Sequence, residues 1–390
     1  MKRKKAPTAD LETIMPILIG AWRRFRQIPG PPDRLQTREF RSVVDAVLKL
    51  QAKTDEKGQS LIGTDYFSNP ELLGAYLLYF WVLHYQEGLS VIGELPFTPR
   101  RVLDICSGGA PFAFAAQQHG ALEVYATDQN VRALELGAQV IGRYGNSLAV
   151  RKWTCLKEAC PVEGTFDLII LGHALDELFP DNQKGWRDQQ NTFIQKLLNR
   201  LTPQGCLLIV DSSQEVMNHR ILQLRDTLVA AGVPVQAPCV WKGDCVALKA
   251  NSVCYAQRPM EKPYLLKEIQ RAAGINLGSL KMSYLIVRRP DAAWPQLPEG
   301  EKFYRIISPP VETHHGTRYY LCGTDGKKNL GTRLKLHPAS SKAFEYLKRG
   351  ELIKITNALE QHHIYDIVEG TQITIEAALG KPVKEVYHDD

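Results

Sequence analysis

The sequence has few cysteines, no long apolar run and no periodic glycine or proline. Its longest apolar run, residues 72–83, has 12 residues, whereas a helix needs about 20 to cross a bilayer, so a membrane span is excluded. The 29 Gly and 23 Pro follow no period, which excludes collagen-like and low-complexity chains. Eight Cys in 390 residues are too few for a disulfide framework. We therefore expect reduced thiols. We also expect a cytoplasmic protein, because Asp10 and Glu12 interrupt the N-terminal segment that resembles a secretory signal.

The composition is otherwise typical of a folded protein of two or three domains, with 44% hydrophobic and 23% charged residues. The net charge of +6 is uneven. Residues 1–40 contain nine Lys or Arg and four Asp or Glu, and therefore carry +5. This basic arm favours an anionic partner such as RNA, and a solubilising tail explains it equally well.

The hydrophobic pattern divides the chain into three parts. Residues 1–97 are expected to form a helical extension, with a buried helix over 71–88. In residues 98–290, short apolar strands alternate with helices, which predicts right-handed βαβ units and a doubly wound α/β sheet. Residues 291–390 alternate with period two, which predicts a small β-rich C-terminal domain. In that domain we expect strands over 318–322, 333–336, 352–356 and 372–375 and a helix over 341–349.

The first strand of the sheet, 101–105, leads into a turn of small residues and a helix start, which is typical of a nucleotide-binding corner. Asp104 stands where a dinucleotide fold needs Gly, and its charge suits the sulfonium and ammonium groups of S-adenosylmethionine. Asp128 ends the next strand, where an acid can accept hydrogen bonds from ribose hydroxyls. A doubly wound domain without a cofactor is the alternative. The candidate cofactor-binding residues are Asp104, Cys106, Ser107, Gly108, Gly109, Asp128, Gln129, Gly172 and His173.

Residues 99–290 resemble the class I S-adenosylmethionine-dependent methyltransferases. Their motif of an acid followed by three alternating glycines is present from Asp104 to Ala110, with Cys106 and Ala110 in place of two glycines. The resemblance implies a Rossmann-like sheet in which residues 282–290 form the antiparallel last strand.

Three cysteines, Cys239, Cys245 and Cys254, fall within 16 residues. Their spacing, Cys-x5-Cys-x8-Cys, matches neither a zinc ribbon nor a ferredoxin run, so the spacing does not choose a metal. Three thiols that simply pack are the alternative. The remaining cysteines of residues 1–300 are expected to be structural, namely Cys106, Cys155, Cys160 and Cys206.

The cysteine-rich insertion at 239–280, the strand after it and the segment 321–327 resemble the methyltransferase-like proteins of the small ribosomal subunit. Mitochondrial members of that family are assembly factors that hold a four-iron cluster. The resemblance implies small-subunit ribosomal RNA as partner, with no membrane or DNA partner. It also implies an iron-sulfur cluster, 4Fe-4S with zinc as the alternative, whose ligands would be Cys239, Cys245, Cys254 and Cys322.

A basic segment of the C-terminal domain favours RNA contact. Five cations and one acid, Asp325, fall within 18 residues, interleaved with Tyr319 and Tyr320. Basic side chains bind phosphates and tyrosines stack on unpaired bases, whereas a cationic hairpin face without a ligand is the alternative. The cations are Arg318, Lys327, Lys328, Arg333 and Lys335.

No catalytic residue is assigned from the sequence. The fourth strand ends at Gly172-His173, without the Asn/Asp-Pro-Pro-aromatic motif of amino-group methyltransferases or the Pro-Cys of cytosine-C5 enzymes. His173 could act as a base, but no second group converges on it in the sequence, and Asp176 and Glu177 are expected to lie on a solvated helix face. We expect an S-adenosylmethionine-binding, methyltransferase-like protein that acts on the small ribosomal subunit, through methylation of its RNA, through subunit assembly or through both. A non-catalytic assembly factor and a small-molecule methyltransferase are the alternatives.

Overall fold

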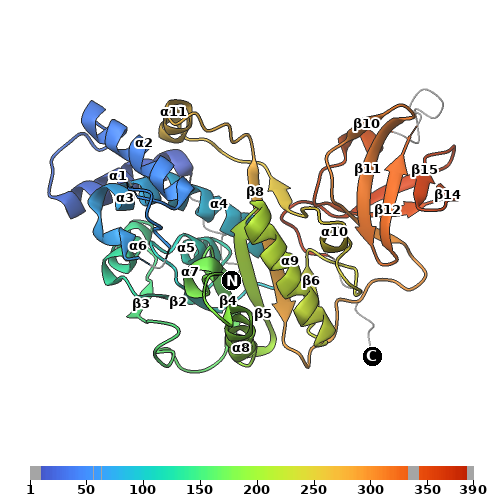
Figure 1. The fold of residues 1–390 in the computed structure, drawn as a ribbon, viewed down its shortest axis with the longest axis horizontal. Helices are drawn as coiled ribbons and strands as arrows, with labels where there is room; N and C mark the ends of the chain where they lie inside the picture. Colours follow the sequence, from blue (N-terminus) through green and yellow to red (C-terminus); the bar gives the residue numbers. More distant parts are fainter. Residues whose placement is uncertain (1–9, 56, 63, 333–341, 384–390) are drawn as a thin grey trace, which may run out of the picture. The chain divides into compact units, whose positions relative to one another are not determined.

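The structure is a computed structural model that describes residues 10–383 except 56, 63 and 333–341. No helix within these residues combines the length and the apolar character that crossing a bilayer requires. The chain forms two compact units, whose elements are labelled in Figure 1. The first comprises Met1–Ile92, Thr98–Gly205 and Pro259–Leu280, and the second comprises Gly93–Phe97, Cys206–Arg258 and Lys281–Asp390.

Helices open the first unit. The amphipathic helices α1 (Leu11–Arg26) and α2 (Thr37–Ala52) precede the short 3-10 helix η1 (Tyr66–Ser68) and a long helix that starts at Pro70. The Asn69 side chain caps this long helix by accepting hydrogen bonds from two backbone N–H groups of its first turn. Its segments are α3 (Pro70–Ala75), the π-helical turn η2 (Tyr76–Phe80) and α4 (Trp81–Ile92). The expected buried helix over 71–88 is confirmed, since most of its side chains lie in the core.

Four parallel strands follow in the order β3-β2-β1-β4. The central strands β1 and β4 are apolar and mostly buried, as in other doubly wound sheets, whereas the edge strand β3 is half-buried to exposed. The strands are β1 (Arg101–Ile105), β2 (Glu123–Asp128), β3 (Ala149–Lys152) and β4 (Phe166–Gly172). The helices of this part are α5 (Pro111–Gln118), α6 (Val131–Gly142), α7 (Leu175–Leu178), α8 (Trp186–Leu198) and α11 (Tyr264–Ala272).

Strand β5 (Leu201–Ser212) continues the sheet, whose full order is β3-β2-β1-β4-β5-β8-β6. Strand β8 (Leu280–Arg288) runs antiparallel to β5, so the predicted antiparallel last strand is confirmed. The remaining elements here are α9 (Glu215–Ala230), β6 (Val235–Ala237), α10 (Val246–Lys249) and β7 (Ala256–Arg258).

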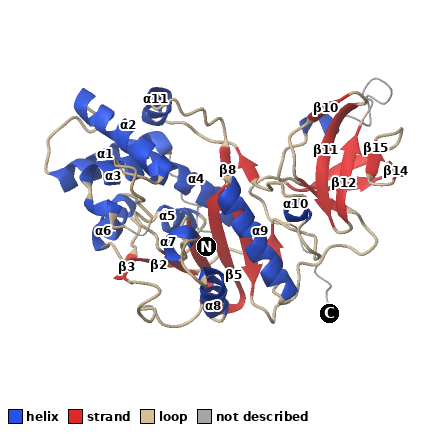
Figure 2. Ribbon diagram, in the orientation of Figure 1, coloured by secondary structure: helices blue, strands red, loops and turns tan. Residues whose placement is uncertain are grey.

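The C-terminal sheet has the order β14-β15-β12-β11-β9-β13-β16, and Figure 2 shows several of its strands in red. Its core contains Tyr304, Tyr319 and Phe344. The predicted helix over 341–349 is wrong, because its described part holds only the 3-10 turn η3 (Phe344–Tyr346) before Leu347 becomes extended. The predicted strand over 333–336 lies outside the described residues. The strands are β9 (Phe303–Ile306), β10 (Val311–Thr313), β11 (Gly316–Gly323), β12 (Gly326–Gly331), β13 (Leu352–Thr356), β14 (Leu359–Gln361), β15 (Ile364–Asp366) and β16 (Gln372–Ala377).

Candidate functional site

The turn between β1 and α5 is tied to the end of β2 through Asp128. One carboxylate oxygen of Asp128 accepts a hydrogen bond from the Gly108 N–H and the other from the Asn130 N–H, both at 2.9 Å. Cys106 and Ala110 have φ values of 54° and 60°. L-residues adopt this left-handed region at a cost of about 1–2 kcal/mol. The two positions that depart from the methyltransferase motif are therefore positions where the backbone favours glycine.

The other residues predicted around this turn differ in accessibility. Ser107 is buried and its N–H donates to the Thr127 carbonyl at 2.9 Å. Gln129 is exposed and Gly172 is half-buried. Cys106 lies 3.5 Å from Cys155, sulfur to sulfur. The structure thus brings the β1 turn and the ends of β2 and β4 into one part of the first unit.

Three acids, which we name the acid cluster, interact at this edge: Asp104, Asp128 and Glu177. Asp104 is 1% exposed and accepts a hydrogen bond from the Ala113 N–H at 3.0 Å. Burial, and then the charge of Asp128, raises the pKa of Asp104 well above its ordinary value. Burial also raises the pKa of Asp128, against the hydrogen bonds from Asn130 and Gly108. Buried carboxyls with raised pKa values create an environment that favours a cationic ligand.

Glu177 is the member of the acid cluster that the sequence did not predict. Burial, followed by the charges of Asp176 and Asp128, raises the pKa of Glu177 to about 7. The expected solvated helix face is therefore wrong. Both side chains are half-buried, Asp176 pairs with Lys53, and the Tyr66 hydroxyl donates to Glu177 at 3.3 Å.

Aromatic side chains from the N-terminal helices cover the turn. Trp81 Nε1 donates to the Gly109 carbonyl at 2.8 Å, and a Cβ at Gly108 would lie 2.8 Å from the Tyr76 hydroxyl. Burial and then Glu177, Tyr76 and Asp128 raise the pKa of Tyr66. The helical extension therefore contributes side chains to the site, which the nucleotide motif alone does not reveal.

His173, at the carboxyl end of β4, has two partners from α4. Its Nε2 lies 2.7 Å from Glu87 Oε2, and its ring stacks on His84 with centroids 3.9 Å apart and an interplanar angle of 12°. Burial, and then His173, lowers the pKa of His84 well below its ordinary value. The expectation that no second group converges on His173 is wrong. The signal that could have revealed this pair is a His and a Glu three residues apart on one face of an apolar helix.

The ligating atoms of His84, Glu87 and His173 lie within 4.8 Å of one another. The rings of His84 and His173 are stacked and nearly parallel, however. The lone pairs of their nitrogens lie in the ring planes, so they point in parallel directions and do not converge on one metal ion. This arrangement is better suited to holding a proton than a metal ion. A carboxylate that orients an imidazole is a usual feature of general bases.

The four predicted cluster ligands lie together in the second unit. Burial, and then Cys239 and Cys245, raises the pKa of Cys254 to about 12. The pKa of Cys322 is raised by burial and by the other three thiols, although Cys322 lies on β11, far along the chain from the others. We name Cys239, Cys245, Cys254 and Cys322 the cysteine centre.

Helix α9 fixes the segment that carries three of these cysteines. The buried Asn218 accepts a hydrogen bond from the Cys254 N–H at 3.0 Å and donates to the Cys254 carbonyl at 2.7 Å. Asp226 accepts from the Cys245 N–H at 2.9 Å. Arg225 donates to the carbonyls of Trp241 and Gly243 in the same loop. The backbone of this irregular segment is therefore held at several points.

Arginines accompany the cysteine centre. Arg305 and Arg349 lower the pKa of Cys254, and Arg225 lowers that of Cys322, against the larger effect of burial. Arg305 donates to the Pro238 carbonyl at 2.9 Å, next to Cys239, and Arg349 lies over the Tyr255 ring at 3.6 Å. The cations can compensate negative charge that thiolates would bring.

The predicted basic face of the C-terminal sheet is smaller than the sequence suggests. Tyr319 is 3% exposed and belongs to the core, so its predicted role in stacking on bases is wrong. Lys328 is also buried and is paired with Glu360 at 2.8 Å and with Asp325 at 3.5 Å, so its charge is compensated. Arg333 and Lys335 lie outside the described residues, as do the lysines of the N-terminal arm.

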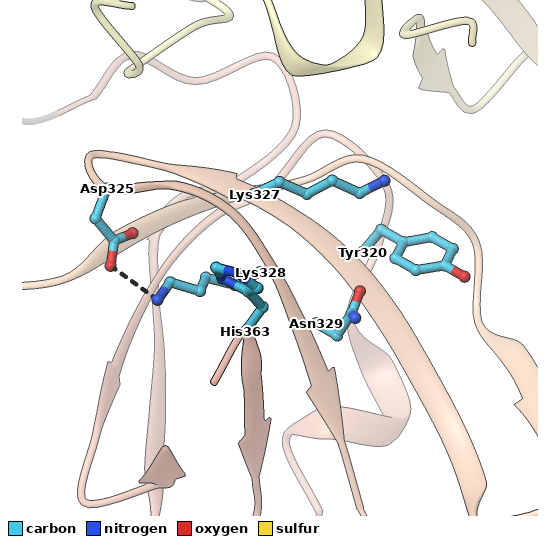
Figure 3. A pocket seen from close by; sticks show the side chains of 6 residues that line it. All are labelled: Tyr320, Asp325, Lys327, Lys328, Asn329 and His363. Carbon is cyan, nitrogen blue, oxygen red and sulfur yellow. Dashed lines mark ion pairs between the residues drawn. The ribbon is translucent and has the colours of Figure 1, made fainter. Parts of the chain in front are cut away.

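A hollow remains on this sheet, and we name it the C-terminal pocket. Its volume is about 410 Å³. Tyr320 is 40% exposed, and Lys327 Nζ lies 5.0 Å from the centre of its ring. Figure 3 shows both side chains with the other residues of the pocket. The lining residues are Tyr320, Asp325, Lys327, Lys328, Asn329 and His363.

A parallel sheet with this strand order, a reversed β8 and a glycine turn after β1 defines the class I methyltransferase fold. The chain belongs to the family described as "Mitochondrial small ribosomal subunit Rsm22", which matches residues 91–351. It is thus a methyltransferase-like protein of a small-ribosomal-subunit family. The cytoplasmic location stays a prediction, since the family description names the mitochondrial subunit. No curated protein matches the chain.

Solved structures with a similar fold are distant in sequence. Ribosomal protein L11 methylase from Lactobacillus delbrueckii subsp. bulgaricus is 15% identical, with a TM-score of 0.31 over 52% of this chain and 76% of that one. The N-methyltransferase NodS from Bradyrhizobium japonicum WM9, in complex with S-adenosyl-l-homocysteine, is 14% identical, with a TM-score of 0.34 over 65% and 99%. Magnesium protoporphyrin IX methyltransferase from Synechocystis PCC 6803 is 14% identical, with a TM-score of 0.32 over 53% and 84%. Similarities this distant carry no argument about ligands.

Proposed function

We propose that this protein binds S-adenosylmethionine and an iron-sulfur cluster and docks on the RNA of the small ribosomal subunit. The observation that carries the proposal is the convergence of four thiols from residues 239 to 322 in a chain whose other unit carries a class I methyltransferase turn. Membership of a small-subunit family supports the ribosomal partner. The parts of the proposal rest on different residues, so each can be tested separately.

The acid cluster supports S-adenosylmethionine as the ligand of the β1 turn. Asp128 keeps free lone pairs beyond the two N–H groups that it accepts, and these can bind ribose hydroxyls. Asp104 is buried and accepts a hydrogen bond from the Ala113 N–H. We therefore assign it two roles, to position α5 and to add negative potential, and no direct contact with the cofactor. Glu177, next to Tyr66, adds a second negative charge on the side of β4. A cationic sulfonium would offset the repulsion among these carboxyls.

The cysteine centre fits a four-thiolate cluster. Four cysteines hold a 4Fe-4S cluster at its corners, and a zinc ion is the alternative for the same four thiolates. Arg225, Arg305 and Arg349 would compensate the net negative charge of such a ligated cluster.

The experiment uses anaerobically purified full-length protein and small subunits from cells that lack it. We expect brown protein with about four irons per chain, heat of binding with S-adenosylmethionine in calorimetry, and co-sedimentation with the subunits. One zinc per chain and no iron would correct the metal, whereas no heat with S-adenosylmethionine would remove the cofactor. Protein that stays in the supernatant without subunits would remove the ribosomal partner.

Methylation of the RNA is the activity that one specific contact favours. Glu87 lies 2.7 Å from His173, at the strand end where class I enzymes place the group that reacts with substrate. In this role His173 takes the proton from the nucleophile that attacks the methyl group, while Glu87 stabilises the resulting imidazolium. Its left-handed φ of 53° is a strained conformation of the kind found at functional sites. The alternative is an assembly factor without turnover, which the missing catalytic motifs favour.

Labelled S-adenosylmethionine separates these two functions. We expect label in ribosomal RNA with the wild type and a loss of about 100-fold or more in rate with His173→Asn, at unchanged cofactor affinity. Glu87→Gln should lower the rate less and shift its pH profile. Binding without label in wild-type protein would assign the assembly role, and label only in a small metabolite would reject the ribosomal account.

A further inference from the structure

The C-terminal pocket has the size and the chemistry of a binding site for one small planar group. Its volume of about 410 Å³ falls in the usual range for small-ligand sites, roughly 300–1,000 Å³. Tyr320 on β11 and Asn329 on β12 are directly opposite in the antiparallel register, so both side chains point to the same face. Four of the six lining residues therefore lie on the paired strands β11 and β12, and Asp325 and His363 lie in turns.

One of the residues that line this pocket carries an unsatisfied polar atom. Asn329 Oδ1 is buried and accepts no hydrogen bond from the described residues. Figure 3 shows the Asn329 side chain between His363 and the Tyr320 ring, with Lys327 extending above it. A buried acceptor without a donor is unfavourable, so a ligand that supplies a donor here is favoured. An amide side chain offers a donor beside the acceptor and thus matches a group with the complementary pair.

The charges in the pocket favour a base more than a stretch of backbone phosphates. Lys328 is neutralised by Asp325 and Glu360, which leaves Lys327 as the lysine of the lining whose ammonium has no carboxylate partner among the described residues. Lys327 lies over the Tyr320 ring. A single cation beside an exposed aromatic ring suits one nucleotide, with its base on the ring and its phosphate on the ammonium.

We propose that the C-terminal pocket binds one unpaired RNA base. The base stacks on Tyr320, an amino group of its edge donates to Asn329 Oδ1, and Lys327 moves from the ring to the adjacent phosphate. Adenine and cytosine carry an amino group next to a ring acceptor, which is the edge that an asparagine pairs with in two hydrogen bonds. This inference rests on the proposed docking on ribosomal RNA and specifies which feature of that RNA the C-terminal sheet recognises.

Short labelled RNAs test the pocket directly, with full-length protein and fluorescence anisotropy as the readout. The probes are five-residue oligo-A, oligo-C and oligo-U and an abasic chain of the same length. We expect oligo-A and oligo-C to bind more tightly than oligo-U, and the abasic chain to bind weakest. Equal affinity for the abasic chain would reduce the pocket to a phosphate contact and overturn the proposal.

Two pairs of variants identify the residues. Tyr320→Ala should weaken every oligonucleotide by roughly 5- to 150-fold, while Tyr320→Phe keeps the ring and stays within about 2-fold of wild type. Asn329→Leu should remove the preference for oligo-A and oligo-C over oligo-U, at unchanged melting temperature, because it also removes the unsatisfied oxygen. A preference that survives Asn329→Leu would overturn the role of Asn329.

The failure of this inference differs from the failure of the proposed function. Wild-type protein that co-sediments with small subunits but binds no oligonucleotide would overturn the base pocket alone. Protein that binds neither would overturn both.

Discussion

Cys322 and Lys327 face each other in the antiparallel pair β11–β12. A proposed ligand of the cysteine centre and the cation of the C-terminal pocket therefore occupy opposite positions on one ladder. Loss of the cluster would free this end of β11, and the pocket is two residues away at Tyr320. RNA binding should therefore depend on an intact cluster, whereas the cluster should not depend on RNA binding.

The first prediction follows from this register. Cys322→Ser should abolish the absorbance of the cluster near 400 nm and also lower RNA affinity, because the pocket loses its anchored strand. Lys327→Ala should lower RNA affinity and leave iron content unchanged. The matched control is Cys160→Ser, a half-buried loop cysteine outside the cysteine centre, which should change neither. Iron analysis and anisotropy on the same samples decide the matter, and unaltered RNA binding by Cys322→Ser would refute the coupling.

A second prediction concerns the hydrogen bonds of Asn218. Asn218→Ala removes both bonds to the Cys254 backbone and leaves the cysteine thiol itself in place. We expect a lower iron content and a loss of about 1–3 kcal/mol in the free energy of unfolding. Gln223→Ala, on the exposed side of the same helix, is the control and should retain iron. Iron retention in Asn218→Ala equal to that of the control would show that the loop holds its shape without α9.

The pH dependence of cofactor binding is the third prediction. The pKa of Glu177 is about 7, and a cationic ligand binds its ionised form better. Affinity for S-adenosylmethionine should therefore rise from pH 6 to pH 8, by at most about tenfold per pH unit below 7. Glu177→Gln should flatten this profile in calorimetry, and the exposed Asp188→Asn should not. A dissociation constant that is independent of pH in wild-type protein would separate Glu177 from the cofactor.

The same carboxyl affects the stability of the protein without ligand. Its pKa lies above the ordinary value of 4.5, so ionisation costs stability as the pH rises from about 4.5 through about 7. Glu177→Gln should therefore raise the melting temperature at pH 8 and leave it almost unchanged at pH 4.5. An increase of equal size at both pH values would point to packing rather than to charge.

The fourth prediction tests the backbone of the cofactor turn. Ala110 has a φ of 60°, so Ala110→Gly should raise the free energy of unfolding by up to about 1 kcal/mol. Ala116→Gly, in the right-handed helix α5, should lower it by about 1 kcal/mol or more. Urea denaturation measures both variants. Destabilisation by Ala110→Gly as large as by Ala116→Gly would mean that the left-handed turn relaxes at no cost.

The sequence predicts the sheet well because most of its strands are short apolar runs that end at recognisable turn sequences. Asp128 could be placed from the sequence for this reason, since the end of a strand fixes the position of its last side chain. The contact of Glu87 with His173 could not, because 86 residues separate them and the packing of α4 against the sheet decides the contact. The strand and helix patterns carry no information about that packing.

The C-terminal face shows a different limit. Tyr319 and Tyr320 are adjacent, and in a strand neighbours point to opposite faces. The sequence places both on a basic strand but does not state which ring enters the core, and burial selects Tyr319. Likewise, the charge of Lys328 is visible in the sequence, whereas its neutralisation by Glu360 requires β14 to lie near β12.

The π-helical turn at Tyr76–Phe80 has a consequence for the whole first unit. A turn of this kind contains one residue more than an α-helical turn, and one residue corresponds to about 100° of rotation around a helix. Deleting a single residue there would rotate His84 and Glu87 away from the end of β4 while Asn69 still caps the helix start. The rotation of this helix about its axis, and not only its apolar character, therefore decides whether His84 and Glu87 of the N-terminal extension reach the end of β4.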